Sequence, residues 1–204
     1  MSLKKIYLIR HGQTDLNLQG IVQGSGVDSP LNETGRWQAE KFFQAYQHIK
    51  FDKVYTSVLQ RAQQSVQGFL DLGLPHEAHA GLNEICWGWR EGTKISPEED
   101  AYYYEVLGRW QQGEIDLPIE GGESPVQVAE RQKPVIDLIL SRPEEETILI
   151  CMHGRAMRVF LSQLLHYPLS QMDRFIHYNL CLYQLNFTGS MLWVEKFADV
   201  SHLS

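Results

Sequence analysis

The chain has 204 residues, of which 43% are hydrophobic and 21% are charged. This length and apolar content are sufficient for one globular domain with a well-filled core. The 25 Asp and Glu residues outnumber the 18 Lys and Arg residues, and the formal net charge of -7 argues against nucleic acid or an anionic membrane as the main partner. No run of about 18 apolar residues occurs, and residues 1–5 enter a strand without a signal-peptide core. We therefore predict a cytoplasmic protein without a nucleic-acid or membrane partner, and leave its oligomeric state open.

The first half of the chain alternates between strand and helix patterns. Apolar spacing and turn residues predict strands over 4–10, 51–56 and 76–80, and helices over 33–48 and 58–71. Asn32 and Ser57 precede the two helices and are expected to be their N-caps. Residues 81–95 form a loop rich in Gly and Trp.

The second half begins with two Ser-Pro helix starts. Ser96-Pro97 and Ser124-Pro125 predict helices over 97–112 and 126–141. A strand over 147–152, a helix over 155–165 and a hairpin of residues 180–187 with 191–197 follow. The three acidic residues 144–146 are expected to form a solvated turn. The whole predicts an α/β fold: a three-layer sandwich with a mostly parallel central sheet, an antiparallel edge strand and helices on both faces. Residues 1–204 are expected to form a single domain.

Two histidines follow two of the predicted strands. Arg10-His11-Gly12 comes after the first strand, and His153-Gly154-Arg155 after the strand over 147–152. Since parallel strands end at the same sheet edge, where α/β folds bind ligands, both histidines can meet in one crevice. A neutral imidazole is a nucleophile and a guanidinium is a fork for phosphate oxygens, so the pair suggests phosphoryl transfer through a histidine.

A third cation, Arg61, lies in the first turn of the helix predicted after the strand over 51–56. A helix N-terminus and an arginine attract an anion together. Taken alone, an arginine in a first turn is more typical of a solvated surface, and a histidine after a strand is more typical of a structural group. Their shared position at three strand ends favours a phosphate site.

Several motifs in this order resemble the histidine phosphatase superfamily, which includes cofactor-dependent phosphoglycerate mutases. They cover residues 5–190 and are Leu8-Ile9-Arg10-His11-Gly12-Gln13-Thr14 with Asn17, Pro30-Leu31-Asn32-Glu33-Thr34-Gly35, Ser57-Val58-Leu59-Gln60-Arg61-Ala62, Leu82-Asn83-Glu84, Gly122-Glu123-Ser124 and His153-Gly154. The resemblance implies that His11 is phosphorylated and that Glu84 donates a proton. It also implies a phosphate pocket of Arg10, Arg61 and His153, with further substrate contacts at Asn17, Gln23, Gly24 and Gly154.

These roles suit the residue types. His11 must present one bare ring nitrogen while an acceptor holds its other N–H. Arg10, Arg61 and a protonated His153 would balance the charge that the transition state spreads over the phosphoryl oxygens. Glu84 would protonate the departing oxygen and then deprotonate the attacking water. This chemistry needs no metal and no cofactor.

Other phosphate and metal chemistries lack their residues. The chain has no GxxxxGK[ST] loop. In cysteine phosphatases an Arg follows the catalytic Cys by six residues, whereas those positions after Cys86, Cys151 and Cys181 hold other residue types. The three cysteines also lack a CxxC spacing, which argues against a disulfide framework or a Cys-rich zinc site. His76 and His79 are too close for a zinc-protease helix and are expected on a surface strand or loop.

The segment of about residues 85–123 is expected to be an insert that selects the substrate. It contains six aromatic residues that could line an apolar pocket or pack around a helix: Trp87, Trp89, Tyr102, Tyr103, Tyr104 and Trp110. The mutases of the family carry a basic cluster in a longer insert, but only Arg90, Lys94 and Arg109 occur here. We therefore predict a phosphomonoester hydrolase acting on a small phosphorylated metabolite. A phosphoglycerate mutase is the enzymatic alternative, and a non-catalytic regulatory protein that binds a phosphate ligand is the alternative of another class.

Overall fold

The computed structural model describes residues 3–94 and 101–204. One sheet of six strands has the order β3-β2-β4-β1-β5-β6. The strands are β1 (Lys4–Arg10), β2 (Lys53–Thr56), β3 (His76–Ala78), β4 (Thr147–Met152), β5 (Leu182–Phe187) and β6 (Leu192–Asp199). Strands β3, β2, β4 and β1 are parallel, and β5 pairs antiparallel with both β1 and β6. The predicted mostly parallel sheet with an antiparallel hairpin at its edge is confirmed.

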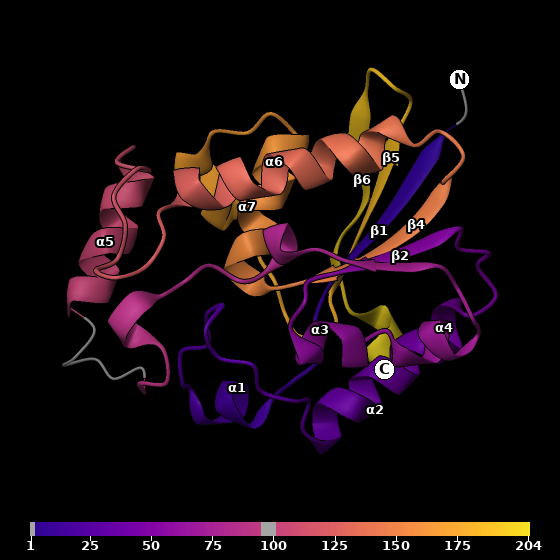
Figure 1. The fold of residues 1–204 in the computed structure, drawn as a ribbon, viewed down its shortest axis with the longest axis horizontal. Helices are drawn as coiled ribbons and strands as arrows, with labels where there is room; N and C mark the ends of the chain where they lie inside the picture. The colour runs from indigo at the N-terminus through magenta and orange to yellow at the C-terminus, as the bar shows by residue number, and fades with distance from the viewer. Residues whose placement is uncertain (1–2, 95–100) are drawn as a thin grey trace.

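Helices cover both faces of this sheet (Figure 1). On one face lie α6 (Pro125–Ser141) and α7 (Gly154–Leu164), and on the other lie α2 (Glu33–Tyr46), α3 (Gln60–Gln64) and α4 (Gln67–Asp71). Away from the sheet lie α1 (Asp15–Gln19) and α5 (Ala101–Gln111). Short 3₁₀ turns complete the chain: Ala80–Leu82, Gly88–Arg90, Leu169–Arg174 and Ser201–Leu203. The predicted three-layer α/β sandwich is confirmed.

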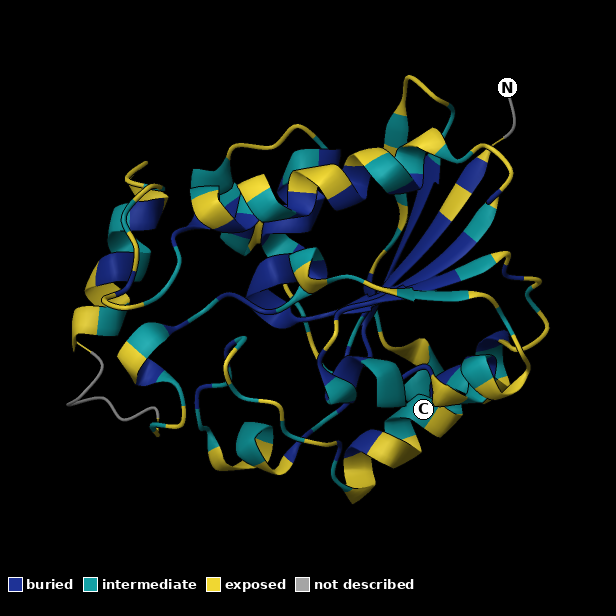
Figure 2. Cartoon of the chain, in the orientation of Figure 1, coloured by how far each residue is buried: buried dark blue, intermediate teal, exposed yellow. Residues whose placement is uncertain are grey.

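Residues 6–9 of the central strand β1 are apolar and buried, because helices cover both faces of the sheet (Figure 2). Ile6 and Leu8 belong to the core cluster beneath α6 and α7, whereas Tyr7 and Ile9 belong to the cluster against α2 and α4. A third cluster, around Trp110, packs α5 against the loops beside it. No described helix is long and apolar enough to cross a membrane.

The prediction of one helix over 58–71 with Ser57 as its N-cap is wrong in two respects. It is two short helices, α3 and α4, separated at Ser65 and Val66. The Ser65 hydroxyl donates to the Arg61 carbonyl and accepts from the Gly12 N–H, so it serves a contact with β1 as well as its own helix. The N-cap of α3 is Leu59 and not Ser57, whose hydroxyl bonds a histidine ring instead.

Other predicted boundaries differ less. The predicted start at Ser96-Pro97 lies outside the described residues, and the helix is described from Ala101 onward. The start at Ser124-Pro125 is confirmed, with a capping box between Ser124 and Gln127. No helix was predicted between residues 10 and 33, but α1 lies there, and Thr14 and Asn17 form a capping box at its start.

Candidate active site

Two histidines meet at the carboxyl end of the sheet. Arg10 and Met152 are the last residues of β1 and β4 and pair in register, so the next residue of each strand leaves the sheet at the same edge. These residues are His11 and His153, both buried. Their ring centroids are 5.1 Å apart, with 52° between the ring planes. Both side chains therefore reach one small site.

The local contacts of His11 determine its tautomer. Nδ1 lies 2.7 Å from the Gly12 carbonyl oxygen, which can only accept, so Nδ1 carries the proton and Nε2 is bare. A side chain at position 12 would meet the Gly35 carbonyl oxygen at 2.7 Å, and Gly12 therefore allows this close approach. Burial, then the charges of Arg10 and Arg61, lower the pKa of His11 well below its usual value. His11 is thus held as a neutral imidazole with a bare Nε2.

His153 is the N-cap of α7, and its ring is fixed by one hydrogen bond. Its Nε2 lies 2.7 Å from the Ser57 hydroxyl oxygen, and its buried Nδ1 has no hydrogen-bond partner among the described residues. Burial, then Arg61 and His11, lower the pKa of His153 well below its usual value. Burial and the nearby cations therefore favour the neutral ring in the protein alone. The protonated His153 expected in the transition state stays a prediction. A bound dianion would have to supply the compensating charge.

Two arginines bring positive charge to the same place. Arg61 is fully buried in the first turn of α3, and its guanidinium donates to the carbonyl oxygens of Val27 at 2.5 Å and Gly24 at 3.2 Å. A terminal nitrogen of Arg10 lies 3.4 Å from His177 Nδ1. The Nε–H groups of both arginines are buried and have no partner in the described part of the chain. Burial lowers the pKa of each guanidinium, but an arginine this basic stays charged.

Glu84 lies on the opposite wall, at the N-terminus of α7. Its carboxylate accepts backbone hydrogen bonds from Ile85 at 2.9 Å, Ala156 at 2.8 Å and Arg155 at 3.1 Å. The 3₁₀ turn before it and helix α7 together fix Glu84 beside the two histidines.

These groups enclose a hollow of about 210 Å³. Its lining residues are Arg10, His11, Asn17, Ile21, Val22, Gln23, Glu84, Trp87, Tyr103, Gly154, Arg155 and His177. Arg61 and His153 lie behind this surface, fully buried. Residues 3–94 and 101–204 contain no group of three or more His, Cys, Asp or Glu side chains placed to hold a metal ion.

The four residues expected as further substrate contacts divide into two kinds. Asn17 and Gln23 line the hollow, and the Gln23 amide donates to the Thr14 hydroxyl at 2.7 Å. Gly154 also lines it, and a side chain there would meet the His177 ring at 2.7 Å. Gly24 is not in the lining and instead bonds Arg61 through its carbonyl.

The aromatic residues of the insert also divide. Trp87 and Tyr103 line the hollow, and fully buried Trp110 packs on Trp87 with ring centroids 6.0 Å apart. Trp89, Tyr102 and Tyr104 are exposed. Neither reading of the aromatic cluster therefore holds for all six residues.

The two arginines of the insert, Arg90 and Arg109, do not contribute to the hollow. The Arg90 guanidinium lies 5.2 Å from the Trp89 ring centroid, and Arg109 pairs with Glu114. Neither arginine lines the hollow.

Three residues of the site had no predicted role in it. Ser57 was taken for a helix cap, and His177 carries no local signal because it approaches Arg10 from 167 residues away. Arg155 stands in the His153-Gly154-Arg155 motif but received no role. Its guanidinium lies 5.9 Å from the Trp87 ring centroid and pairs with Asp173.

The family model of the histidine phosphatase superfamily, branch 1, matches residues 6–200. The chain belongs to this superfamily. A protein from Erwinia tasmaniensis, named probable phosphoglycerate mutase GpmB, is 30% identical over 208 residues, which cover 98% of this chain and 94% of that relative.

Solved structures of histidine phosphatases resemble this chain over almost its whole length. The alpha-ribazole phosphatase from Shigella flexneri is 25% identical with a TM-score of 0.84, and the match covers 96% of each chain. A mycobacterial glucosyl-3-phosphoglycerate phosphatase, solved with VO3, is 24% identical with a TM-score of 0.84, and covers 96% of this chain and 98% of its own. The similarity to this second structure shows a shared fold only.

Proposed function

We propose that this histidine phosphatase is a metal-independent phosphomonoester hydrolase that acts on a small phosphorylated metabolite through a phosphohistidine at His11. The observation that carries the proposal is the cluster of unpaired polar atoms around His11. Nε–H of Arg10, Nε–H of Arg61 and Nδ1 of His153 are all buried without partners in the described chain, at the edge where His11 presents a bare Nε2. Buried polar groups are normally satisfied, so a phosphoryl group is the natural partner.

In the first step His11 Nε2 attacks phosphorus. The N–P bond forms as the ester P–O bond breaks, and the electron pair goes to the departing oxygen, which takes its proton from Glu84. Arg10 and Arg61 hold the phosphoryl oxygens, and the developing negative charge favours a proton on His153. The products of this step are phosphohistidine and a free alcohol.

In the second step water takes the place of the alcohol. Glu84, now a carboxylate, accepts a proton from the water, whose oxygen attacks phosphorus as the N–P bond breaks. Inorganic phosphate is released, His11 regains its bare Nε2, and Glu84 is protonated again for the next turnover. Because Nδ1 keeps its proton against the Gly12 carbonyl in both steps, the ring orientation is maintained.

The leaving group would lie against Trp87 and Tyr103, with Ile21 and Val22 beside them. The small hollow favours a compact metabolite. Two of the similar solved structures are named alpha-ribazole phosphatase and glucosyl-3-phosphoglycerate phosphatase, and these names support phosphate-ester hydrolysis as the reaction class. We further propose that residues 1–204 act as one domain, in the cytoplasm, with residues 85–123 selecting the substrate.

A phosphoglycerate mutase is the second candidate, supported by the 30% identical GpmB relative. A mutase must hold the phosphoryl group long enough to return it to a second hydroxyl. Among the described residues of the insert, the basic residues Arg90, Lys94 and Arg109 are all absent from the lining of the hollow, so they form no basic cluster there that could retain an acid during that exchange. Measuring 3-phosphoglycerate isomerisation beside phosphate release separates the candidates, and isomerisation that outruns hydrolysis would establish the mutase.

The decisive experiment measures phosphate release from para-nitrophenyl phosphate and a panel of metabolite phosphates in EDTA. We expect turnover by the wild type and none by His11→Ala. His48→Ala is the matched control, because His48 is exposed and does not line the hollow. Inactivity of the wild type on the whole panel would favour a phosphate-binding regulatory protein instead.

A further inference from the structure

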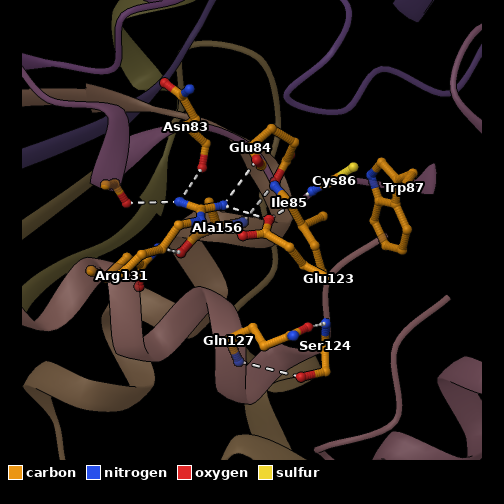
Figure 3. A network of polar contacts seen from close by, with 12 residues as sticks. Asn83, Glu84, Ile85, Cys86, Trp87, Glu123, Ser124, Gln127, Arg131 and Ala156 are labelled. Atoms are coloured by element: carbon orange, nitrogen blue, oxygen red, sulfur yellow. Dashed lines mark hydrogen bonds and ion pairs between the residues drawn. The ribbon is translucent and has the colours of Figure 1, made fainter. Parts of the chain in front are cut away.

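Arg131, on the second turn of α6, does not line the hollow, yet it donates three hydrogen bonds to the segment that carries Glu84 and two to Glu123 (Figure 3). One terminal nitrogen donates to the carbonyl oxygens of Gly81 at 2.8 Å and Asn83 at 3.0 Å. The other donates to the Glu84 carbonyl oxygen at 2.9 Å and to Glu123 at 3.0 Å, and Nε donates to Glu123 at 2.7 Å.

Glu123 fixes this guanidinium from the other side. Its two oxygens bind Arg131 as a bidentate pair, which also orients the plane of the guanidinium. The same carboxylate accepts from the Cys86 N–H at 2.8 Å, and the Glu123 N–H donates to the Cys86 carbonyl at 2.9 Å. Burial raises the pKa of Glu123, but the hydrogen bonds from Arg131 and Cys86 outweigh it and lower the pKa, so the carboxylate is charged.

The segment 81–86 is thereby held at both ends on α6. A side chain at Gly81 would meet the Arg131 carbonyl oxygen at 2.6 Å, so the backbone lies directly on the helix. Glu84 stands between these anchors, with its carbonyl on Arg131 and its carboxylate on the N–H groups that begin α7. Without Arg131, three carbonyl oxygens would lose their donor, and the α7 contacts alone would locate the carboxylate.

We infer that Arg131, oriented by Glu123, is a positioning residue that sets the place of the Glu84 carboxyl relative to the departing oxygen. The inference rests on the proposed role of Glu84 as proton donor. A displacement of about 1 Å at a reacting group can cost on the order of 10²-fold in rate. The clamp formed by Arg131 and Glu123 therefore acts on catalysis without contact with the substrate.

The dependence of activity on the leaving group tests this role, because a purely structural defect would lower the activity on all substrates alike. A para-nitrophenolate is stable as an anion and leaves without a proton, whereas an alkoxide needs one from Glu84. The ratio of kcat/KM for para-nitrophenyl phosphate to kcat/KM for an alkyl phosphate such as glycerol phosphate therefore reports proton donation. Since kcat/KM covers steps up to the first irreversible one, later hydrolysis of phosphohistidine does not enter it.

We expect Arg131→Met to lower kcat/KM for the alkyl phosphate by about 10²-fold and that for para-nitrophenyl phosphate by less than about 5-fold. Glu123→Gln should change the ratio in the same direction by less. Glu84→Gln removes the proposed proton donor itself and should therefore change this ratio the most. Arg142→Met is the matched control, because Arg142 also bonds several groups but lies at the other end of the sheet, and it should leave the ratio unchanged.

Each other outcome has a definite meaning. Equal losses for both substrates in Arg131→Met and Glu123→Gln would make the clamp structural only and overturn the inference. An unchanged ratio in Glu84→Gln would overturn the proton-donor role and the clamp with it, while phosphohistidine formation could stand. If Arg131→Met does not fold, Arg131→Lys keeps the charge and stem but loses the fork, and the same change of ratio is expected.

Discussion

The two ends of the sheet both bury charged groups, but they handle them differently. At the amino end the charges are matched. Lys4 Nζ donates to the carbonyl oxygens of Arg142 at 2.8 Å and Glu145 at 2.6 Å, and the Tyr55 hydroxyl donates to the Glu145 carboxylate at 2.5 Å. Arg142 bonds both Glu77 and Glu145. Each of these charged groups already has its partner among the described residues.

At the carboxyl end the charges are unbalanced. Arg10 and Arg61 both lie near the Glu84 carboxylate, whose oxygens are engaged by three backbone N–H groups, and Arg61 also lies near Asp28 and Glu91. Among the described residues, the Nε–H groups of both arginines and Nδ1 of His153 are buried without partners. A matched network stabilises the fold, whereas a surplus of buried donors is the property of an anion site. The comparison separates structural from functional charge within one sheet.

The largest expected effect tests the unbalanced end. Arg61→Ala should lower kcat/KM by on the order of 10³-fold, because it removes a charge that the transition state uses. The free energy of unfolding should also fall by about 1–3 kcal/mol, because the side chain is fully buried and the carbonyl oxygens of Val27 and Gly24 lose their donor. Steady-state kinetics and a melting curve on the same preparation check both statements. A variant that keeps its activity would remove Arg61 from the phosphate site.

The next effect is one of pH. The pKa values of His11 and His153 are lowered on folding, so the unfolded chain binds more protons at low pH. The free energy of unfolding should therefore reach its full value above pH about 6.5. As the pH drops below 6.5, it should decrease by up to about 1.4 kcal/mol per pH unit for each histidine.

The same lowering keeps His11 unprotonated, so kcat/KM should hold at pH values well below 6.5. Denaturant titrations and rate profiles between pH 5 and 8 measure both, taking pH about 6.5 as the ordinary histidine midpoint. His11→Gln should flatten the stability profile. A decline of kcat/KM that begins at the ordinary midpoint would contradict the buried neutral nucleophile.

A change at the balanced end should affect stability without affecting activity. Tyr55→Phe deletes a buried hydroxyl that donates to Glu145 and accepts from Arg142. The free energy of unfolding should fall by about 1–3 kcal/mol, because both partners lose a hydrogen bond in a buried place. Activity at saturating substrate should be unchanged. Chemical denaturation gives the first quantity, and a large loss of kcat would mean that the two ends are coupled.

The smallest expected effect concerns Ser57. Ser57→Ala removes the 2.7 Å hydrogen bond to His153 Nε2 and should lower kcat/KM by about 5- to 10-fold, in line with about 1 kcal/mol for one hydrogen bond. Ser57→Thr retains a hydroxyl and is the control. Equal activity of Ser57→Ala and the wild type would show that the His153 ring is held by packing alone.

The sequence predicted the elements whose signal is local. Strands β1 and β4 have the predicted bounds, because a strand covered on both faces is a continuous apolar run. The meeting of His11 and His153 followed from the order of strand ends. Their partners could not be predicted, because Ser57 and His153 are 96 residues apart and His177 and Arg10 are 167 apart.

The acidic run 144–146 shows the same limit. It was expected to be a solvated turn, and this is wrong for Glu145, which is buried with 8% of its surface exposed. Its carboxylate meets the Tyr55 hydroxyl, 90 residues away. A run of like charges describes the local chain, whereas burial depends on which distant groups the fold brings to it. Arg131 escaped notice for the same reason, since its carbonyl partners are 47 to 50 residues distant.

The most direct test of His11 as phosphoryl carrier is to trap the intermediate. Wild-type enzyme mixed with a substrate labelled in its phosphate is quenched during turnover, and the labelled residue is identified by peptide mass spectrometry under alkaline conditions. We predict one phosphoryl group on the His11 imidazole, formed and lost at rates that match turnover and absent from His11→Ala. Steady phosphate release without a label on His11, or with the label on another residue, would contradict the phosphohistidine route.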